Sequence, residues 1–312
     1  MLDKHNNESL VTVIIPSYNH AQYIQNAIES VKKQTYKKWE LIIIDDGSKD
    51  NTHEVLMNMP KDDRIKIVLN TDNKRQSARI NQALSMASGE YISLLPSDDW
   101  YLENKLEKQI QLFKELSEDY GVVYSGGFRY YEDLDKMIDI KANLTMRRGH
   151  VLDKLLLEPS FIYPNSPLIK KACFDTFPFD ESYTAEGEAI YTKFAMKYKF
   201  DFVDEPLVVM RDHAYNIGAN TEIMLNENTR YLEELFNHRD FPSNLQQYKS
   251  RLFGELYRMK GLEFIKLHKE LKKGRNSLLM SLKYNLKYLF DIKVIAGLTL
   301  SVLPKTIVDK II

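Results

Sequence analysis

One stretch decides the fold: Gly89-Glu90-Tyr91-Ile92-Ser93-Leu94-Leu95-Pro96-Ser97-Asp98-Asp99-Trp100. A helix-like run ends at Gly89, and the apolar run 91–95 has the length and composition of a buried strand. Two adjacent carboxylates, Asp98 and Asp99, follow where that strand ends. Ligands of open α/β sheets collect outside the carboxyl ends of the strands, and two neighbouring anions favour a hard divalent cation. A solvated turn is the alternative, because Asp is common in turns.

Strands and helices alternate before this stretch. Apolar runs at 11–15, 39–44 and 65–69 predict three further strands, and apolar residues at helical spacing predict helices near 23–31 and 78–87. This order predicts an α/β fold with a mostly parallel sheet, built from right-handed βαβ units and flanked by helices.

Composition limits the classes of protein. The chain has 312 residues and a net charge of −1, which gives no reason to expect a nucleic-acid partner. A single cysteine, Cys173, excludes an intrachain disulfide, and the first ten residues lack the apolar core of a signal peptide, so we expect a cytoplasmic protein. Charge is uneven, because residues 260–312 are net +7 and residues 1–259 are net −8. We expect a catalytic-type domain over 1–215 and a helical region over 216–312.

The loop after the first strand carries no glycine-rich phosphate fingerprint. It contains Pro16-Ser17-Tyr18-Asn19 instead, with an aromatic ring suited to stacking on a base. Asp46, after the second strand, offers an acceptor for the imide N–H of uracil or thymine. A surface ring and a turn residue before Gly47 are the ordinary alternatives. Since the strand ends are adjacent in such a sheet, we expect Tyr18, Asp46 and the Asp98-Asp99 pair to face one crevice.

These segments resemble the family 2 glycosyltransferases, which are inverting GT-A-fold enzymes that use nucleotide sugars. The resemblance rests on four ordered stretches and extends over about residues 10–215: Val11–Asn19, Gln34-Thr35-Tyr36, Glu40–Ser48 and Gly89–Asp99. It implies transfer of a sugar from a nucleoside-diphosphate donor, with UDP favoured, to a glycan or lipid-linked acceptor hydroxyl. It also implies a divalent metal, Mn²⁺ or Mg²⁺.

The resemblance assigns roles residue by residue. The nucleotide would be held by eight residues: Pro16, Tyr18, Asn19, Asp46, Arg79, Asn81, Ser97 and Asp98. The metal would be held by Asp98 and Asp99, with His213 as an extra ligand, although a histidine in a surface loop is an equal alternative. Many relatives carry a further acidic residue where this chain has Pro96, so a three-carboxylate site is not available.

The catalytic base falls in the segment Glu186-Gly187-Glu188. Members of the resembled family usually have Glu-Asp there, and the position of that Asp is Gly187 in this chain. The base is therefore expected to be Glu186 or Glu188. The alternative is structural, because carboxylates in the first turn of a helix are favoured by the helix dipole.

The carboxyl-terminal region is expected to be helical, with a break at Lys272-Lys273-Gly274-Arg275. The apolar run 294–303 is shorter than the about 20 residues that span a bilayer, and lysines flank it. Such a segment suits an interfacial anchor on an anionic membrane. Packing on the catalytic domain or on a second subunit, as a homodimer, is the competing interpretation.

Two other functions stay open at this point. A sugar-nucleotide pyrophosphorylase has a related sheet but would need a glycine-rich loop where Pro16-Ser17-Tyr18 stands. A non-catalytic sugar-nucleotide-binding relative is suggested by Pro96 and Gly187, the two departures from the family pattern.

Overall fold

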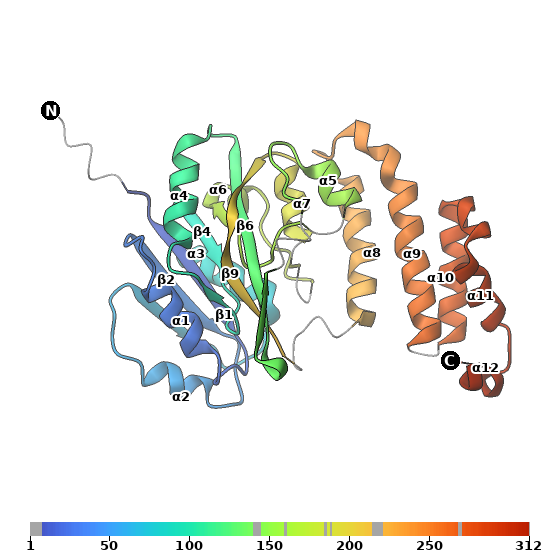
Figure 1. Cartoon of the computed structure of the whole chain (residues 1–312), viewed down its shortest axis with the longest axis horizontal. Helices are drawn as coiled ribbons and strands as arrows, with labels where there is room; N and C mark the ends of the chain where they lie inside the picture. Colours follow the sequence, from blue (N-terminus) through green and yellow to red (C-terminus); the bar gives the residue numbers. More distant parts are fainter. Residues whose placement is uncertain are drawn as a thin grey trace. The chain divides into compact units, whose positions relative to one another are not determined.

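The computed structural model describes residues 8–139, 145–158, 161–183, 186–187, 189–213, 221–267 and 270–311. The chain forms two compact units, Met1–Asn216 and Ile217–Ile312 (Figure 1). Each is described by itself below.

The first unit is built on a sheet that has nine strands among the described residues. They are β1 (Val11–Ser17), β2 (Trp39–Asp45), β3 (Ile65–Leu69), β4 (Tyr91–Leu94), β5 (Trp100–Tyr101), β6 (Tyr120–Tyr131), β7 (Lys136–Asp139), β8 (Leu168–Lys170) and β9 (Lys199–Asp212). Their order is β3-β2-β1-β4-β8-β6-β9-β5, and β7 pairs with β6. The first four strands in this order are mutually parallel, as are β6 and β9, whereas β8, β5 and β7 run antiparallel to their neighbours. The predicted α/β class with a mostly parallel sheet is confirmed.

Helices cover both faces of this sheet. The helical segments of the unit are α1 (Ile24–Lys32), α2 (Thr52–Met57), α3 (Arg75–Met86), α4 (Lys105–Glu115), η1 (Glu132–Leu134), α5 (Leu152–Leu157), α6 (Lys171–Thr176) and α7 (Ala189–Ala195). Side chains alternate along β1, so Val11, Val13 and Ile15 enter the core cluster that includes α1 and α4. The opposite face of β1 and β2 is covered by α3. Burial on both faces explains why these strands are nearly continuous apolar runs.

β1 is the central strand of the arrangement that positions the site. It lies between β2 and β4, with Ser17 beside Asp45 and Ile14 beside Leu94. Because the strands are parallel, their carboxyl ends meet at one edge. The expectation that these strand ends are adjacent is confirmed.

One boundary in this unit differs from the prediction, and one strand is irregular. α3 begins at Arg75 rather than Ala78, because the Asp46 carboxylate holds the backbone N–H groups of Lys74 and Arg75. The apolar residues on either side of Asp204 and Glu205 belong to one strand, β9. A register shift against β6 absorbs the irregularity, since Val203 pairs with Ser125 and Pro206 with Gly126.

The second unit is helical, as predicted. It consists of α8 (Thr221–Asn237), η4 (Ser243–Tyr248), α9 (Lys249–Lys266), α10 (Leu271–Tyr284), η5 (Leu286–Phe290), α11 (Ile292–Leu300) and α12 (Lys305–Ile311). Within its described part, no helix combines the length and the apolar composition needed to cross a membrane.

The predicted break at 272–275 is displaced, because α9 ends at Lys266 and α10 begins at Leu271, so 272–275 lies in the first turn of α10. Gly274 serves helix packing rather than a turn. A Cβ there would lie 2.4 Å from Cγ1 of Ile265 and 2.9 Å from the carbonyl oxygen of Gly261, so only glycine lets α10 approach α9 this closely.

Candidate functional site

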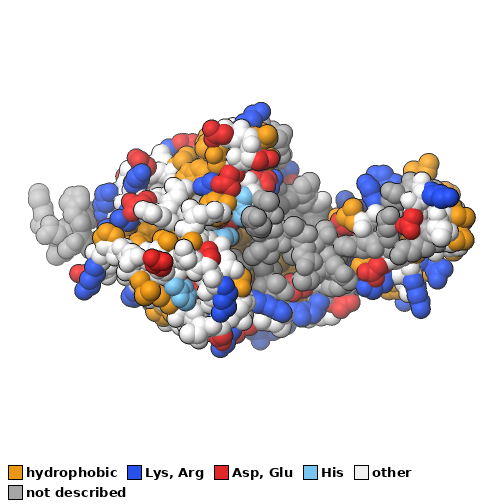
Figure 2. Space-filling view, turned by 90° about the horizontal axis from the view of Figure 1, so that it is seen from below, with side chains coloured by type: hydrophobic (Ala, Val, Ile, Leu, Met, Phe, Trp, Pro, Cys, Tyr) orange, Lys and Arg blue, Asp and Glu red, His pale blue; other side chains and the backbone are white. Residues whose placement is uncertain are grey.

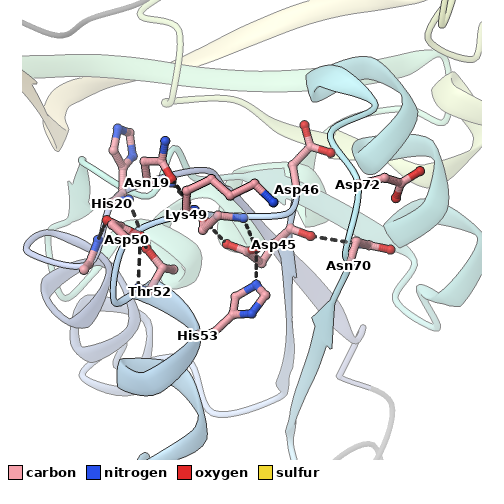
Figure 3. A network of polar contacts seen from close by, with 12 residues as sticks. Asn19, His20, Asp45, Asp46, Lys49, Asp50, Thr52, His53, Asn70 and Asp72 are labelled. Carbon is pink, nitrogen blue, oxygen red and sulfur yellow. Dashed lines mark hydrogen bonds and ion pairs between the residues drawn. The ribbon is translucent and has the colours of Figure 1, made fainter.

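The loop that follows β2 is held by Asp45, whose carboxylate is fully buried. One oxygen accepts from the Ser48 backbone N–H at 2.8 Å and lies 2.6 Å from Nε2 of His53, and the other accepts from the Ser48 hydroxyl. The Asp45 carbonyl accepts from the side chain of Asn70 at 2.7 Å. This network, drawn in Figure 3, fixes the loop that carries Asp46.

The loop that follows β1 is tied to the same network through Asn19. Its backbone N–H donates to the Ser48 hydroxyl at 2.8 Å, and its side-chain oxygen accepts from the Lys49 N–H at 2.7 Å. Asn19 has a φ of 55°, which Asn tolerates better than most residues. These contacts make Asn19 a residue that shapes the loop, and they leave the neighbouring Tyr18 ring 42% exposed at the strand end. Pro16 lies within β1 itself, beside Ile44 of β2.

Asp46 is engaged by three donors at the start of α3. Oδ1 accepts from the Lys74 N–H and from Nε of Arg79, both at 2.7 Å, and Oδ2 accepts from the Arg75 N–H at 2.9 Å. The Asp46 and Arg79 side chains are only 8% and 5% exposed. Arg79 also donates to the carboxylate of Asp72 at 2.8 Å. The guanidinium therefore orients Asp46, and the expected direct contact of Arg79 with a nucleotide does not fit this geometry.

Asn81 of α3 contacts a segment far away in the sequence. Its side-chain amide donates to the carbonyl of Phe179 at 2.9 Å and to the carboxylate of Glu181 at 3.1 Å. Asn81 thus joins α3 to the segment before α7.

A histidine cluster surrounds Asp98. Nε2 of His213, the residue after β9, lies 3.1 Å from Oδ2 of Asp98. The ligand atoms of Asp98, His213 and His20 all lie within 4.8 Å of one another. Ser97, which is buried, contacts Nδ1 of His20 at 2.7 Å. Burial is the main cause that lowers the pKa of His20, which favours the neutral imidazole that metals bind.

Asp99 does not share the surroundings of Asp98. It is 3% exposed, and its two oxygens accept from the Arg211 N–H at 2.8 Å and from the side chain of Asn165 at 2.9 Å. Burial, together with the charge of Asp98, raises its pKa well above the usual range of a carboxyl. The expectation that both aspartates face a metal is therefore corrected. Among the described residues, the group of possible metal ligands contains Asp98, His20 and His213 and does not contain Asp99.

Arg211 supports this cluster through hydrogen bonds to Asp98 and Glu132. Nε donates to the Asp98 carbonyl at 3.1 Å, and Nη1 donates to the carboxylate of Glu132 at 3.0 Å. The guanidinium carbon lies 4.7–5.3 Å from the centres of three aromatic rings, those of Tyr23, Trp100 and Tyr130. These contacts hold β9 so that His213, two residues on, reaches Asp98.

Glu186 lies in a buried ion pair with Lys193 of α7. Its second oxygen accepts from the Asp180 N–H at 2.9 Å, and its own N–H approaches the hydroxyl of Ser77 in α3 at 3.4 Å. Burial raises the pKa of Glu186, and Lys193 partly opposes this shift. Glu188, the other candidate base, lies outside the described residues.

Comparison with known proteins assigns the chain to a family. The model of Glycosyl transferase family 2 matches residues 12–175. The chain belongs to this family. Glycosyl transfer from a nucleotide sugar is its activity, and the pyrophosphorylase alternative is set aside.

Individual relatives of this family 2 glycosyltransferase agree. It is 32% identical over 219 residues to glycosyltransferase GlyG of Streptococcus pneumoniae, covering 67% of this chain and 72% of GlyG. It is 46% identical over 103 residues to WfgD of Escherichia coli, a UDP-Glc:α-D-GlcNAc-diphosphoundecaprenol β-1,3-glucosyltransferase. That match covers 33% of this chain and 40% of WfgD. The structure of Staphylococcus aureus TarS 1–349 in complex with UDP-GlcNAc superposes with a TM-score of 0.68, covering 93% and 90% of the two chains, at 17% identity.

One candidate residue of this family 2 glycosyltransferase, His20, was not predicted from the sequence. His20 directly follows Tyr18 and Asn19 in the loop after the first strand. A polar residue at that strand end was the available signal. Its partner, His213, is far away in sequence, so only the pairing of the strands brings the two together.

Proposed function

We propose that this enzyme moves a sugar from a UDP-linked donor to an acceptor hydroxyl in surface-polysaccharide synthesis, with inversion at the anomeric carbon. The observation that carries the proposal is that polar residues follow neighbouring strands at one edge of the sheet: Tyr18 and Asp46 follow β1 and β2, and Asp98, after β4, contacts His213, after β9. The UDP donor named for WfgD and the UDP-GlcNAc bound to TarS support the choice of nucleotide. A hexose is the sugar we propose.

The nucleotide would lie between Tyr18 and Asp46. The exposed Tyr18 ring offers a stacking face, and Asp46 Oδ2, which accepts one hydrogen bond, retains a lone pair for an imide N–H. Pro16 and the backbone near Asn19 would form the wall of this site, and Ser97 and Asp98 would lie near the diphosphate.

A divalent metal fits the cluster of Asp98, His213 and His20. One carboxylate and two imidazoles form a mixed oxygen–nitrogen set, which favours a first-row ion such as Mn²⁺ over Mg²⁺. When bound, such an ion neutralises charge on a departing diphosphate. The chain itself would hold His213 in place through Arg211 and hold His20 through Ser97.

Glu186 is our proposed base, with Glu188 as the alternative. A carboxylate would take the proton of the acceptor hydroxyl as its oxygen attacks the anomeric carbon, and the nucleoside diphosphate would leave from the opposite face. The raised pKa of Glu186 makes its carboxylate a stronger base, but it can accept a proton only after its pair with Lys193 opens. That closed pair is also the observation that favours the second candidate function, binding without catalysis.

We further propose that residues 1–215 and residues 216–312 have separate roles. Residues 1–215 would form the catalytic domain, and residues 216–312 would hold the enzyme on the cytoplasmic face of a membrane, close to a lipid-linked acceptor. The basic and apolar composition of residues 260–312 supports this arrangement. A homodimer formed through the helical region is the alternative.

The test is release of UDP from a panel of UDP-sugars with Mn²⁺, with Mg²⁺ and with a chelator. We expect one donor to be hydrolysed or transferred in Mn²⁺, more slowly in Mg²⁺ and not after chelation. Turnover separates the two functions. An enzyme that uses Glu186 as its base would lose turnover in Glu186→Gln and keep its donor affinity, whereas a binding protein would retain donor affinity and show no turnover in any variant. Tight donor binding by the wild type without turnover on any acceptor extract would refute catalysis.

A further inference from the structure

The turn between η5 and α11 exposes large apolar side chains. The exposed fractions are 69% for Leu286, 50% for Leu289, 89% for Phe290 and 78% for Ile292. We call these four residues the apolar tip. A nearly fully exposed Phe beside three exposed aliphatic residues is unusual for the surface of a soluble unit and marks an interaction site.

The tip is held in this conformation by its own polar contacts. Tyr288, which lies among the tip residues, turns inward, and its hydroxyl donates to Glu255 at 2.7 Å. Asp291 caps α11 by accepting from the Lys293 N–H at 2.8 Å and pairs with Arg258 of α9 at 2.6 Å. The contacts of Tyr288 and Asp291 fix the backbone on both sides of Phe290, and this fixed backbone directs the apolar side chains outward.

The charge around the tip is positive. Lys283, Lys287 and Lys293 are exposed and lie within the same short segment. The nearby carboxylates, Glu255 and Asp291, share one cation, Arg258, so these three groups and the three lysines together carry a net charge of +2. Figure 2 shows hydrophobic and basic side chains next to one another on the surface of the helical unit.

We propose that the apolar tip docks this protein on an anionic phospholipid bilayer. Lysines attract the acidic headgroups, and Phe290 with its aliphatic neighbours enters the boundary between headgroups and acyl chains. A second copy of the chain is a poorer occupant. A two-fold contact centred on the tip would bring the lysines of both copies into one interface, and like charges repel.

This surface extends the membrane-proximal acceptor of the proposed function, but its test does not depend on catalysis. Vesicle binding can fail while UDP turnover persists, and the converse holds as well.

The first experiment is co-sedimentation of the full chain with vesicles of phosphatidylcholine containing 30% phosphatidylglycerol, and with phosphatidylcholine alone. We expect binding to the anionic vesicles and partial release by high salt, because salt screens the lysines and not the apolar contacts. Phe290→Ser/Ile292→Ser should lower the partition coefficient at least about tenfold at any salt. Each of Lys283→Gln, Lys287→Gln and Lys293→Gln should lower it about fivefold at low salt.

The matched control is Met57→Ser/Leu134→Ser in the first unit, where the side chains are 68% and 66% exposed. It removes comparable exposed apolar surface far from the tip in sequence, and it should bind vesicles as the wild type does. Circular dichroism melting of each variant checks that it folds, which substitutions of exposed residues should not disturb.

A second readout reports insertion directly. Phe290→Trp should show a blue shift in emission with anionic vesicles, relative to the wild-type background of Trp39 and Trp100. Absence of vesicle binding by the wild type at low salt, or unchanged binding by Phe290→Ser/Ile292→Ser, would overturn the proposal. So would a wild-type dimer in light scattering that this double variant converts to a monomer, since the tip would then be a contact between copies.

Discussion

Asp46→Asn tests whether the ion pair with Arg79 organises the nucleotide-binding edge of the sheet. The substitution keeps the size of the side chain and removes its charge. It also points an amide nitrogen at backbone N–H groups of Lys74 and Arg75 or at Arg79, all of which are donors. Arg79, with a side chain 5% exposed, would keep its charge in a buried site without its buried partner.

The expected loss follows from this burial. Removing one partner of a buried ion pair costs about 3–5 kcal/mol, because the other charge stays desolvated. We expect the lower end, about 3 kcal/mol, since Arg79 retains its bond to Asp72. At an m value of about 3 kcal/mol per molar urea, the unfolding midpoint would fall by about 1 M.

Tryptophan fluorescence is the suitable assay, because both tryptophans, Trp39 and Trp100, lie in the first unit. The transition of that unit is therefore followed without the helical unit. Asp72→Asn is the matched control on the same guanidinium. Its carboxylate is 59% exposed, so we expect no resolvable change in the midpoint.

The same variant examines nucleotide binding. Loss of a hydrogen bond to a charged acceptor is worth at least about 1.5 kcal/mol, so UDP affinity measured by calorimetry should fall about tenfold or more. Equal midpoints for Asp46→Asn and Asp72→Asn would refute the ion-pair reasoning. A lowered midpoint with unchanged UDP affinity would show that Asp46 supports the edge without contacting the nucleotide.

Further outcomes are expected for other buried groups. Asp98→Asn and His20→Gln should each weaken Mn²⁺ binding at least about tenfold in a spin-resonance titration, and Asp99→Asn should weaken it less. Equal effects of all three variants would contradict the different surroundings of the two aspartates. Glu186→Gln should lower turnover and spare UDP affinity if Glu186 is the base, and wild-type turnover would move the role to Glu188. Lys105 is fully buried, and burial lowers its pKa well below the usual value. The unfolded chain therefore binds more protons than the folded chain, so the free energy of unfolding rises with pH toward the ordinary lysine pKa. Urea titrations between pH 6 and 9 should show this rise in the wild type and a smaller one in Lys105→Met, and parallel curves would mean that the buried amine keeps its proton.

Local patterns were sufficient for the elements and for most of their order. The apolar runs 11–15 and 91–95 are strands because they are long enough to be buried on both faces and are ended by polar residues. Parallel pairing then brings Ser17 and Asp45 to the same edge, which is why Tyr18 and Asp46 could be placed together from the sequence.

Contacts over long sequence distances were beyond that reasoning. Gly274 looked like a helix break, and its value as a packing residue depends on Ile265 in the preceding helix. Arg147 and Arg148 are adjacent in the chain, but they pair with carboxylates that lie far from each other in the sequence. Arg147 pairs with Glu158, and Arg148 lies 3.4 Å from Asp201, near the start of β9.

The sequence by itself determined the α/β class, the family and the polar residues that end the neighbouring strands at one edge of the sheet, because strand periodicity and strand-end residues are local properties. Only the tertiary structure decided which partners each side chain at that edge contacts. Asp98 and Asp99 are adjacent in the chain, yet neighbouring side chains diverge, so one meets His213 and the other meets Asn165 and the backbone of Arg211. Those partners arrive through the pairing of β9 with β5 and β6, and no local pattern encodes which carboxylate they reach.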